Sequence, residues 1–244
     1  MRAAVISDIH ANLTALEAVL EAMSEREPDV IWCLGDTVGY GAEPNECVAL
    51  VRERCDACLA GNHDLGVLGA IPIDVFSPPA AEAARWTRER LDPEARAFLE
   101  GLSAADEERE AALYHASPRD HVWEYVLSTE QATACLAAQA KRVSLIGHSH
   151  IALAFRAGEE GGEAAGAQIP AGATLDISSD RWLLNPGSVG QPRDGDPRAA
   201  WLELDTERWH VTYHRVEYDV ERAADAISRA GLPAGLGQRL FYGQ

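Results

Sequence analysis

Five short apolar runs divide the chain, and each is followed at once by polar residues that can bind a cation. The runs are Val5–Ser7, Val30–Leu34, Ala57–Ala60, Ala112–Tyr114 and Val143–Ile146. Each has the length and composition of a buried β-strand. The residues that follow them are Asp8-Ile9-His10, Gly35-Asp36, Gly61-Asn62-His63-Asp64, His115 and Gly147-His148-Ser149-His150. Because sites in open α/β sheets form beyond the carboxyl ends of strands, the pattern predicts one polar site assembled from five strand ends.

The first quarter of the chain alternates between strand and helix signals. Asn12 is a helix-capping residue before an apolar stripe over Leu13–Glu25, and Pro44 begins a second helical stretch that extends to about Arg54. These helices separate the first three predicted strands. Strand-helix-strand-helix-strand order is typical of a parallel α/β unit with right-handed crossovers.

Strands dominate the second half. Further strands are expected at residues 110–114, 143–146, 151–155, 174–177, 182–184, 199–204 and 209–216, the last two as a hairpin. Further helices are expected at residues 80–91, 93–102, 129–139 and 220–230. Residues 65–79, 116–125, 158–172 and 231–244 are predicted to be irregular, the second of them as a lid and the third as a mobile loop. The interpretation is a single domain over residues 1–244 with an α/β fold: a four-layer α-β-β-α sandwich of two packed mixed sheets flanked by helices.

The charge balance narrows the possible partners. The chain has 21 Lys and Arg against 39 Asp and Glu, which gives a net charge of −18. Such a surface repels nucleic acid and anionic lipid, and it repels phosphate esters unless bound cations supply positive charge locally. No apolar run reaches the roughly 18 residues of a membrane span, and the N-terminus lacks a signal-peptide core. We therefore expect no membrane partner and a cytoplasmic location; the oligomeric state stays open.

The five cysteines do not predict a disulfide framework. Their number is odd, and Cys55-Asp56-Ala57-Cys58 is an isolated C-x-x-C pair without a second pair or histidines at zinc-finger spacing. Cys33 and Cys58 lie in apolar runs, where a thiol acts as a small hydrophobic side chain.

The polar strand ends contain seven side chains of ligand type, which are Asp8, His10, Asp36, Asn62, His115, His148 and His150. Asp8 and His10 are two residues apart, as are His148 and His150, and in an extended chain such pairs point to the same side. Seven ligands exceed the needs of one tetrahedral metal but suit two metals that share the Asp36 carboxylate. Two-metal sites stabilise the attacking and leaving oxygens in phosphoryl displacement.

Taken together and in this order, the five blocks resemble the calcineurin-like metallophosphoesterase superfamily. The segment Asn185–Arg193 further resembles its small bacterial and archaeal YfcE-type phosphodiesterase branch. One block alone would be weak evidence, whereas five in order are specific.

The resemblance implies a role for each position. It implies two divalent metal ions (Mn, Fe, Zn or Ni), the first held by Asp8, His10 and His150, the second by Asn62, His115 and His148, with Asp36 between them. A hydroxide between the metals would attack phosphorus, and His63 would act as general acid or electrostatic stabiliser beside the leaving oxygen. Asn62 would also contact the phosphate of a small phosphorylated substrate. Independently of the resemblance, Arg119 and Arg193 are candidates to substitute in part for a phosphate-binding arginine.

Two positions depart from the protein serine/threonine phosphatase branch. Gly39 stands where that branch has the Asp that orients the catalytic histidine, and Tyr40 stands where it has a phosphate-binding Arg. Loss of that arginine removes a bidentate partner for a phosphomonoester dianion. This favours phosphodiesters, while phosphomonoesters and dinucleoside polyphosphates stay open.

Several residues have a simpler interpretation. Asp64 is expected to support its loop or His63, Asn185–Ser188 to shape a wall of the site, and His121, His210 and His214 to be surface or structural residues. Two alternative functions also stay open. One is a catalytically inactive protein-binding scaffold of the same fold, as in retromer-type relatives; the other is a nuclease, which the acidic surface disfavours.

Overall fold

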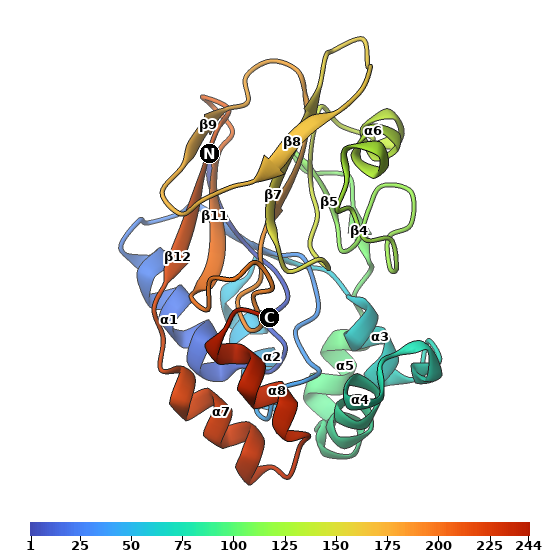
Figure 1. The fold of residues 1–244 in the computed structure, drawn as a ribbon, viewed down its shortest axis with the longest axis vertical. Coiled ribbons are helices and arrows are strands. Elements are labelled where there is room, and N and C mark those ends of the chain that lie inside the picture. Colours follow the sequence, from blue (N-terminus) through green and yellow to red (C-terminus); the bar gives the residue numbers. More distant parts are fainter.

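The computed structural model describes all 244 residues and contains two six-stranded mixed sheets (Figure 1). The first sheet has the order β3-β2-β1-β11-β12-β9. Its strands are β1 (Arg2–Ile6), β2 (Val30–Cys33), β3 (Ala57–Cys58), β9 (Thr174–Asp176), β11 (Ala199–Asp205) and β12 (His210–Val216). β1, β2 and β3 run parallel, as the alternating strand and helix signals predicted, and β11 and β12 form the predicted hairpin.

The second sheet has the order β4-β5-β6-β10-β7-β8. Its strands are β4 (Ala105–Asp106), β5 (Ala112–Tyr114), β6 (Val143–Leu145), β7 (Ala152–Ala157), β8 (Ala165–Gln168) and β10 (Arg181–Pro186). β5, β6 and β10 are parallel, so their carboxyl ends meet at one edge of the sheet. β4 was not predicted, because two paired residues leave no periodic signal.

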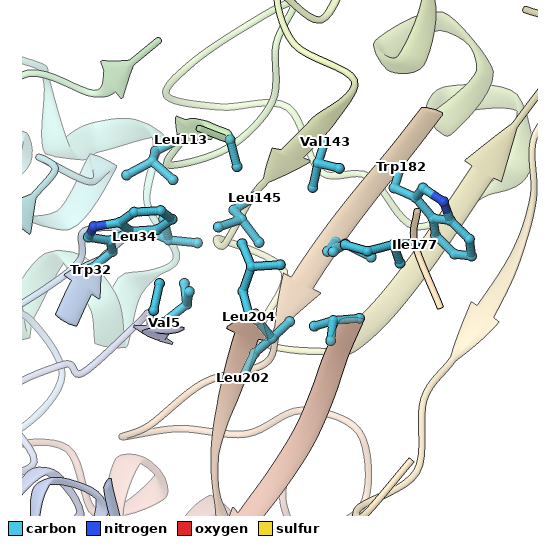
Figure 2. Close-up of a cluster of buried hydrophobic side chains, with 14 of the residues drawn as sticks. Val5, Trp32, Leu34, Leu113, Val143, Leu145, Ile177, Trp182, Leu202 and Leu204 are labelled. Atoms are coloured by element: carbon cyan, nitrogen blue, oxygen red, sulfur yellow. The ribbon is translucent and has the colours of Figure 1, made fainter. Parts of the chain in front are cut away.

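The two sheets pack face to face through one apolar layer. Figure 2 shows Val5, Trp32 and Leu34 of the first sheet facing Leu113 and Leu145 of the second. Trp182 and Ile177 close the same layer further along the sheets. Alternate residues of each strand supply this layer, and burying them is the main favourable contribution to holding the sheets together.

Helices cover the outer faces. α1 (Leu13–Ser24) and α2 (Pro44–Arg54) pack on the first sheet, and α6 (Thr129–Ala138) packs on the second. The side chain of Asn12 caps α1 by accepting the amide of Ala15 at 3.1 Å, as the sequence predicted. The predicted four-layer α-β-β-α sandwich of two packed mixed sheets is confirmed.

The remaining helices gather at one end of the molecule (Figure 1). They are α3 (Asn62–Leu68), α4 (Pro78–Arg90), α5 (Pro93–Glu100), α7 (Val220–Arg229) and α8 (Ala234–Gln238), with 3-10 turns at Ile73–Val75 and Arg239–Phe241. Apolar side chains join α4 to α7, α8 and the last 3-10 turn. No helix combines the length and the apolar character needed to cross a membrane, and all five cysteines are free thiols.

Three segments that were predicted to be irregular contain regular structure. Residues 65–79 continue α3 and begin α4, and residues 231–244 form α8 and a 3-10 turn. Residues 158–172 include the exposed edge strand β8, which pairs with β7. The local sequence pattern did not predict these elements, because they have no strong periodicity and are stabilised by packing and strand pairing. Residues 116–125 are irregular, as predicted.

Candidate metal centre

The seven predicted ligand side chains meet between the carboxyl ends of the two sheets. Four of them follow strands of the first sheet (Asp8, His10, Asp36 and Asn62), and three follow strands of the second (His115, His148 and His150). All seven are buried. Two sets of ligand atoms each lie within 4.8 Å of one another: Asp8, His10, Asp36 and His150 in one, and Asp36, His115 and His148 in the other. Asp36 belongs to both sets.

The two carboxylate oxygens of Asp36 have different surroundings. Its Oδ1 accepts the backbone N–H of His63 at 2.8 Å. Its Oδ2 is buried without a hydrogen-bond partner and lies 3.6 Å from Nε2 of both His10 and His115. One carboxylate oxygen therefore faces a histidine from each set. Gly61 makes this approach possible, since a Cβ at that residue would lie 2.0 Å from Oδ1 of Asp36.

Backbone carbonyls fix the ring orientation of the ligand histidines. The Nδ1 atoms of His10, His115 and His150 lie 3.2, 2.9 and 2.7 Å from the carbonyls of Val38, Leu34 and Gln191. Donation from Nδ1–H leaves each Nε2 with a free lone pair, which is the arrangement found around metal-bound histidines. His148 has the opposite arrangement, because its Nε2 lies 3.2 Å from the carbonyl of Trp123. Its Nδ1 is then the ring nitrogen with the free lone pair.

Oxygen ligands complete the two sets. The Oδ1 atom of Asn62 lies 3.1 Å from Nε2 of His115, and Oδ1 of Asp8 lies 3.5 Å from Nε2 of His150. The Asp8 carboxylate also accepts the backbone N–H of His148, with contacts of 3.1 and 3.2 Å. Each set therefore combines imidazole nitrogens with carboxylate or amide oxygens. This mixture suits borderline divalent cations such as Zn, Ni, Fe and Mn.

The backbone at the ligands is not extended, and that part of the prediction was wrong. Asp8, His10, Asp36, His148 and His150 all have positive φ, between 51° and 64°. A left-handed residue costs on the order of 1–2 kcal/mol for a residue other than glycine. Hydrogen bonds between neighbouring loops hold the strained backbone, including those from Asp8 N to Gly35 O and from His10 N to Asp36 O. From this left-handed backbone Asp8 and His10 reach the same ligand set, whereas His148 and His150 reach different sets instead of pointing to one side.

Burial sets the charge state of these groups. It lowers the pKa of His10 and His150 well below the ordinary value, and that of His148 to about 2, so all three imidazoles are neutral at neutral pH. Burial also raises the pKa of Asp8 to about 7 and that of Asp36 well above its usual range. Burial thus disfavours the charged form of these two carboxylates, and bound divalent cations would stabilise it.

His63 lies beside this cluster without belonging to it. Its ring is 4.9 Å from His10 and 4.4 Å from Tyr40 between centroids, and its Nδ1 has no partner. Gly39 faces the ring, and a Cβ there would lie 2.6 Å from Nδ1. Burial lowers the pKa of His63 to about 3, helped by the nearby positive charge of Arg193.

Asp64 supports the loop, as predicted. Its carboxylate accepts the backbone N–H groups of Gly61, Val38 and Thr37 at 2.9, 3.0 and 3.3 Å. These contacts join the loop after β2 to the start of α3 and leave the carboxylate no free oxygen for His63. Asp64 therefore positions the backbone that carries Asp36 and Asn62.

The end of β10 and the segment that follows it shape one wall of the centre, as predicted. The side-chain amide of Asn185 donates to the carbonyl of Gly147 at 2.7 Å, and the Ser188 hydroxyl donates to the carbonyl of Asp8 at 2.7 Å. The carbonyl of Gln191 lies against His150 Nδ1. These contacts hold the backbone of ligands from both sheets without presenting a reactive group.

A cleft of about 360 Å³ opens beside the cluster. Its lining combines aromatic, amide, imidazole and guanidinium groups: Tyr40, Asn62, His63, Val75, Phe76, Ser77, Ala80, Trp123, Tyr125, Arg193 and Arg239. The predicted substrate residues Asn62 and Arg193 are among them. Arg119 is not among them; it is exposed and paired with Glu124 at 3.3 Å. Arg239 was missed because nothing in the local sequence marked the C-terminal segment as part of a site.

Comparisons with known proteins agree with this geometry. The calcineurin-like phosphoesterase superfamily domain matches residues 1–207. An uncharacterised protein of Methanocaldococcus jannaschii is 39% identical over 99% of this chain and 98% of its own. The crystal structure of a metallophosphoesterase from Sphaerobacter thermophilus is 39% identical, with a TM-score of 0.90 over 100% of this chain and 99% of its own.

A hypothetical protein from Pyrococcus horikoshii shares the fold, with a TM-score of 0.78 at 21% identity over 100% of this chain and 98% of its own. The family match covers all seven predicted ligands and His63. The predicted superfamily is therefore confirmed. The chain belongs to the calcineurin-like phosphoesterase superfamily, and it is a metal-dependent enzyme that hydrolyses phosphoric esters.

Proposed function

We propose that the protein is a two-metal phosphoesterase that hydrolyses small phosphodiesters. Asp8, His10 and His150 would hold one cation, Asn62, His115 and His148 the other, and Asp36 would bridge them. The observation that carries the proposal is the Oδ2 atom of Asp36, buried, unpartnered and 3.6 Å from a histidine of each set. A lone metal would have no need of a carboxylate between two imidazole sets.

The bound cations would neutralise phosphate charge and lower the pKa of a bound water, so that a nucleophile is available near neutral pH. The chain itself would orient the substrate. Asn62 and Arg193, both in the cleft lining, would bind phosphate oxygens. His63 would lie beside the leaving oxygen and donate a hydrogen bond or a proton to it.

The surroundings of His63 support a diester preference. Gly39 gives this imidazole no carboxylate partner, and Tyr40 offers a hydroxyl, 3.3 Å from an Nη of Arg193, in place of a guanidinium. Tyr40 thus takes the place of one guanidinium that would grip a dianionic monoester, and a monoanionic diester needs that partner less. The aromatic rim of Phe76 and Trp123, with centroids 5.8 Å apart, would contact the organic groups of such a substrate.

The test combines metal analysis with a chromogenic assay. We expect about two equivalents of divalent metal per chain, and turnover of bis(p-nitrophenyl) phosphate in Mn, Ni, Zn or Fe that exceeds turnover of p-nitrophenyl phosphate. His115→Ala should lose metal and activity together. His210→Ala is the matched control, because His210 is exposed and lies at the edge of the sheet opposite the carboxyl end of β1.

If the wild-type protein binds no metal tightly and turns over neither substrate in any metal, the protein-binding scaffold becomes the better interpretation. The complete ligand set argues against that alternative, since an inactive scaffold needs no metal ligands.

We further propose that the substrate is a small phosphorylated molecule, that the chain forms a single domain and that the protein is cytoplasmic. The net charge of −18 supports the exclusion of nucleic acid. A measurable, salt-sensitive affinity for DNA would count against that exclusion.

A further inference from the structure

Two arginines in the cleft lie side by side without a carboxylate partner. Arg193 donates to Oε1 of Gln191 at 2.9 Å, and Arg239 donates to the same oxygen at 3.2 Å. Arg193 also reaches the Tyr40 hydroxyl at 3.3 Å, while its Nε is buried without a hydrogen-bond partner. One neutral amide oxygen is thus shared by two cationic groups, which repel each other.

This arrangement contrasts with the rest of the chain. Acidic residues outnumber basic ones by 39 to 21. The other part-buried guanidiniums have either a carboxylate beside them, as in Arg215–Asp194 and Arg109–Asp106, or two or more backbone carbonyls, as in Arg142. Burial and the charge of Arg193 both lower the pKa of Arg239. Two unneutralised guanidiniums at a cleft in an acidic protein form a site that an anion would stabilise.

The second arginine comes from a part of the chain outside the family match. That match ends at residue 207, whereas Arg239 begins the 3-10 turn after α8. Leu236 and Leu240 are buried against Ala80 and Ala83 of α4, which fixes the turn beside the cleft. The C-terminal helices therefore add a positive charge to a cleft that the superfamily domain alone would leave with one arginine.

The contacts between neighbouring groups of the cleft indicate where an anion bound by the two arginines would lie relative to the metal cluster. His63 lies next to the metal cluster, its ring is 4.4 Å from Tyr40, Arg193 lies over Tyr40 at 5.7 Å from the ring centroid, and Arg239 follows through Gln191. These contacts lead from the metal cluster through Tyr40 and Arg193 to Arg239. A phosphate beside Arg239 would be adjacent to a phosphate held at the metals.

We propose that Arg193 and Arg239 form an anion subsite for a second, non-reacting phosphate, so that the substrates are small molecules with two adjacent phosphate groups. This inference rests on the proposed function for the phosphate at the metals, but the subsite itself consists only of side chains of this chain. Arg193 would contact both phosphates, and Arg239 only the second. Arg239 would therefore determine specificity without acting on the reacting atoms.

Binding to the metal-free full-length protein tests the subsite without requiring turnover. Inorganic pyrophosphate should bind in isothermal titration calorimetry more tightly than inorganic phosphate. Arg239→Gln should weaken pyrophosphate binding by about tenfold or more, and Arg239→Lys by less, because a charge remains without the planar fork. Arg222→Gln, which changes an exposed arginine of α7, should bind as the wild type does. Equal pyrophosphate affinity in Arg239→Gln and the wild type, or no binding by the wild type, would overturn the proposal.

A kinetic arm uses the metal-loaded enzyme. The ratio of kcat/KM for a dinucleoside diphosphate to that for bis(p-nitrophenyl) phosphate should fall about tenfold in Arg239→Gln. An unchanged ratio contradicts the subsite even if both substrates are hydrolysed. If the wild type turns over neither substrate but still binds pyrophosphate, the proposed function is contradicted and the anion subsite is supported.

Discussion

The Nε2 atoms of His10 and His150 lie 3.0 Å apart although 140 residues separate them in the chain. Each ring donates its Nδ1–H to a backbone carbonyl, so the two Nε2 lone pairs face one another. Both rings are buried, which lowers the pKa of each and keeps it neutral. Two lone pairs held this close repel unless a cation lies between them, and Oδ2 of Asp36, 3.6 Å from Nε2 of His10, would share that cation.

Asp36→Asn should reduce metal occupancy and rate together. The substitution removes one negative charge from between the two sets while keeping the side-chain volume. We expect loss of at least one metal equivalent and a fall in turnover on the order of 100-fold or more, as for loss of a metal ligand. Plasma emission spectrometry and the bis(p-nitrophenyl) phosphate assay measure both. Full occupancy with a normal rate would show that Asp36 does not bridge.

His63→Ala should affect substrates according to their leaving group. A hydrogen-bond or proton donor matters most when the departing alkoxide is a strong base. The rate on alkyl or nucleoside esters should fall about 100-fold or more, and the rate on nitrophenyl esters much less. Equal losses on both would refute the donor role. The metal content of the variant is the control, and it should match that of the wild type.

Metal removal should destabilise the protein more at pH 8 than at pH 5. Burial raises the pKa of Asp8 from 3.8 to about 7. Between these values the unfolded chain releases the proton and the folded metal-free protein keeps it, so stability falls as pH rises through this window. Bound cations would stabilise the charged carboxylate and abolish that loss. Burial lowers the pKa of His10, His148 and His150, so these rings are neutral with or without metal and their contribution cancels in the comparison.

The measurement is the difference in Tm between metal-loaded and chelator-treated protein at the two pH values. A difference in Tm that is the same at both values, or larger at pH 5, would contradict the assignment of Asp8 to the metal centre. Circular dichroism of the chelated protein at pH 5 serves as the control that the fold persists.

Asp64→Ala should lower stability strongly. The substitution leaves the buried N–H groups of Gly61, Val38 and Thr37 without an acceptor. We expect a loss of about 2–4 kcal/mol in the free energy of unfolding, measured in urea on the metal-free protein. Asp225→Ala, an exposed change on α7, should cost less than about 0.5 kcal/mol. If Asp64→Ala lowers the free energy of unfolding no more than Asp225→Ala does, other groups accept hydrogen bonds from these amides.

The local pattern of apolar and polar residues was enough to predict where the strands end and which ligand-type side chains follow them. Apolar runs followed by Asp, Asn or His mark a sheet edge, because a strand must be buried whereas a polar residue after it can line a site. Asn12 and the spacing of Leu16 and Leu20 likewise identified α1. These features depend on residues close together in sequence, which the chain displays directly.

Other features came only from tertiary structure. The left-handed backbone of Asp8 and His150 depends on hydrogen bonds to distant segments, and the tautomer of each histidine depends on a carbonyl from elsewhere in the chain. Arg239 joins the cleft because α8 packs against α4. The sequence by itself determined which chemical groups the protein would bring to its centre. The tertiary structure decided their directions and the second arginine of the cleft, because both depend on contacts between residues far apart in the chain.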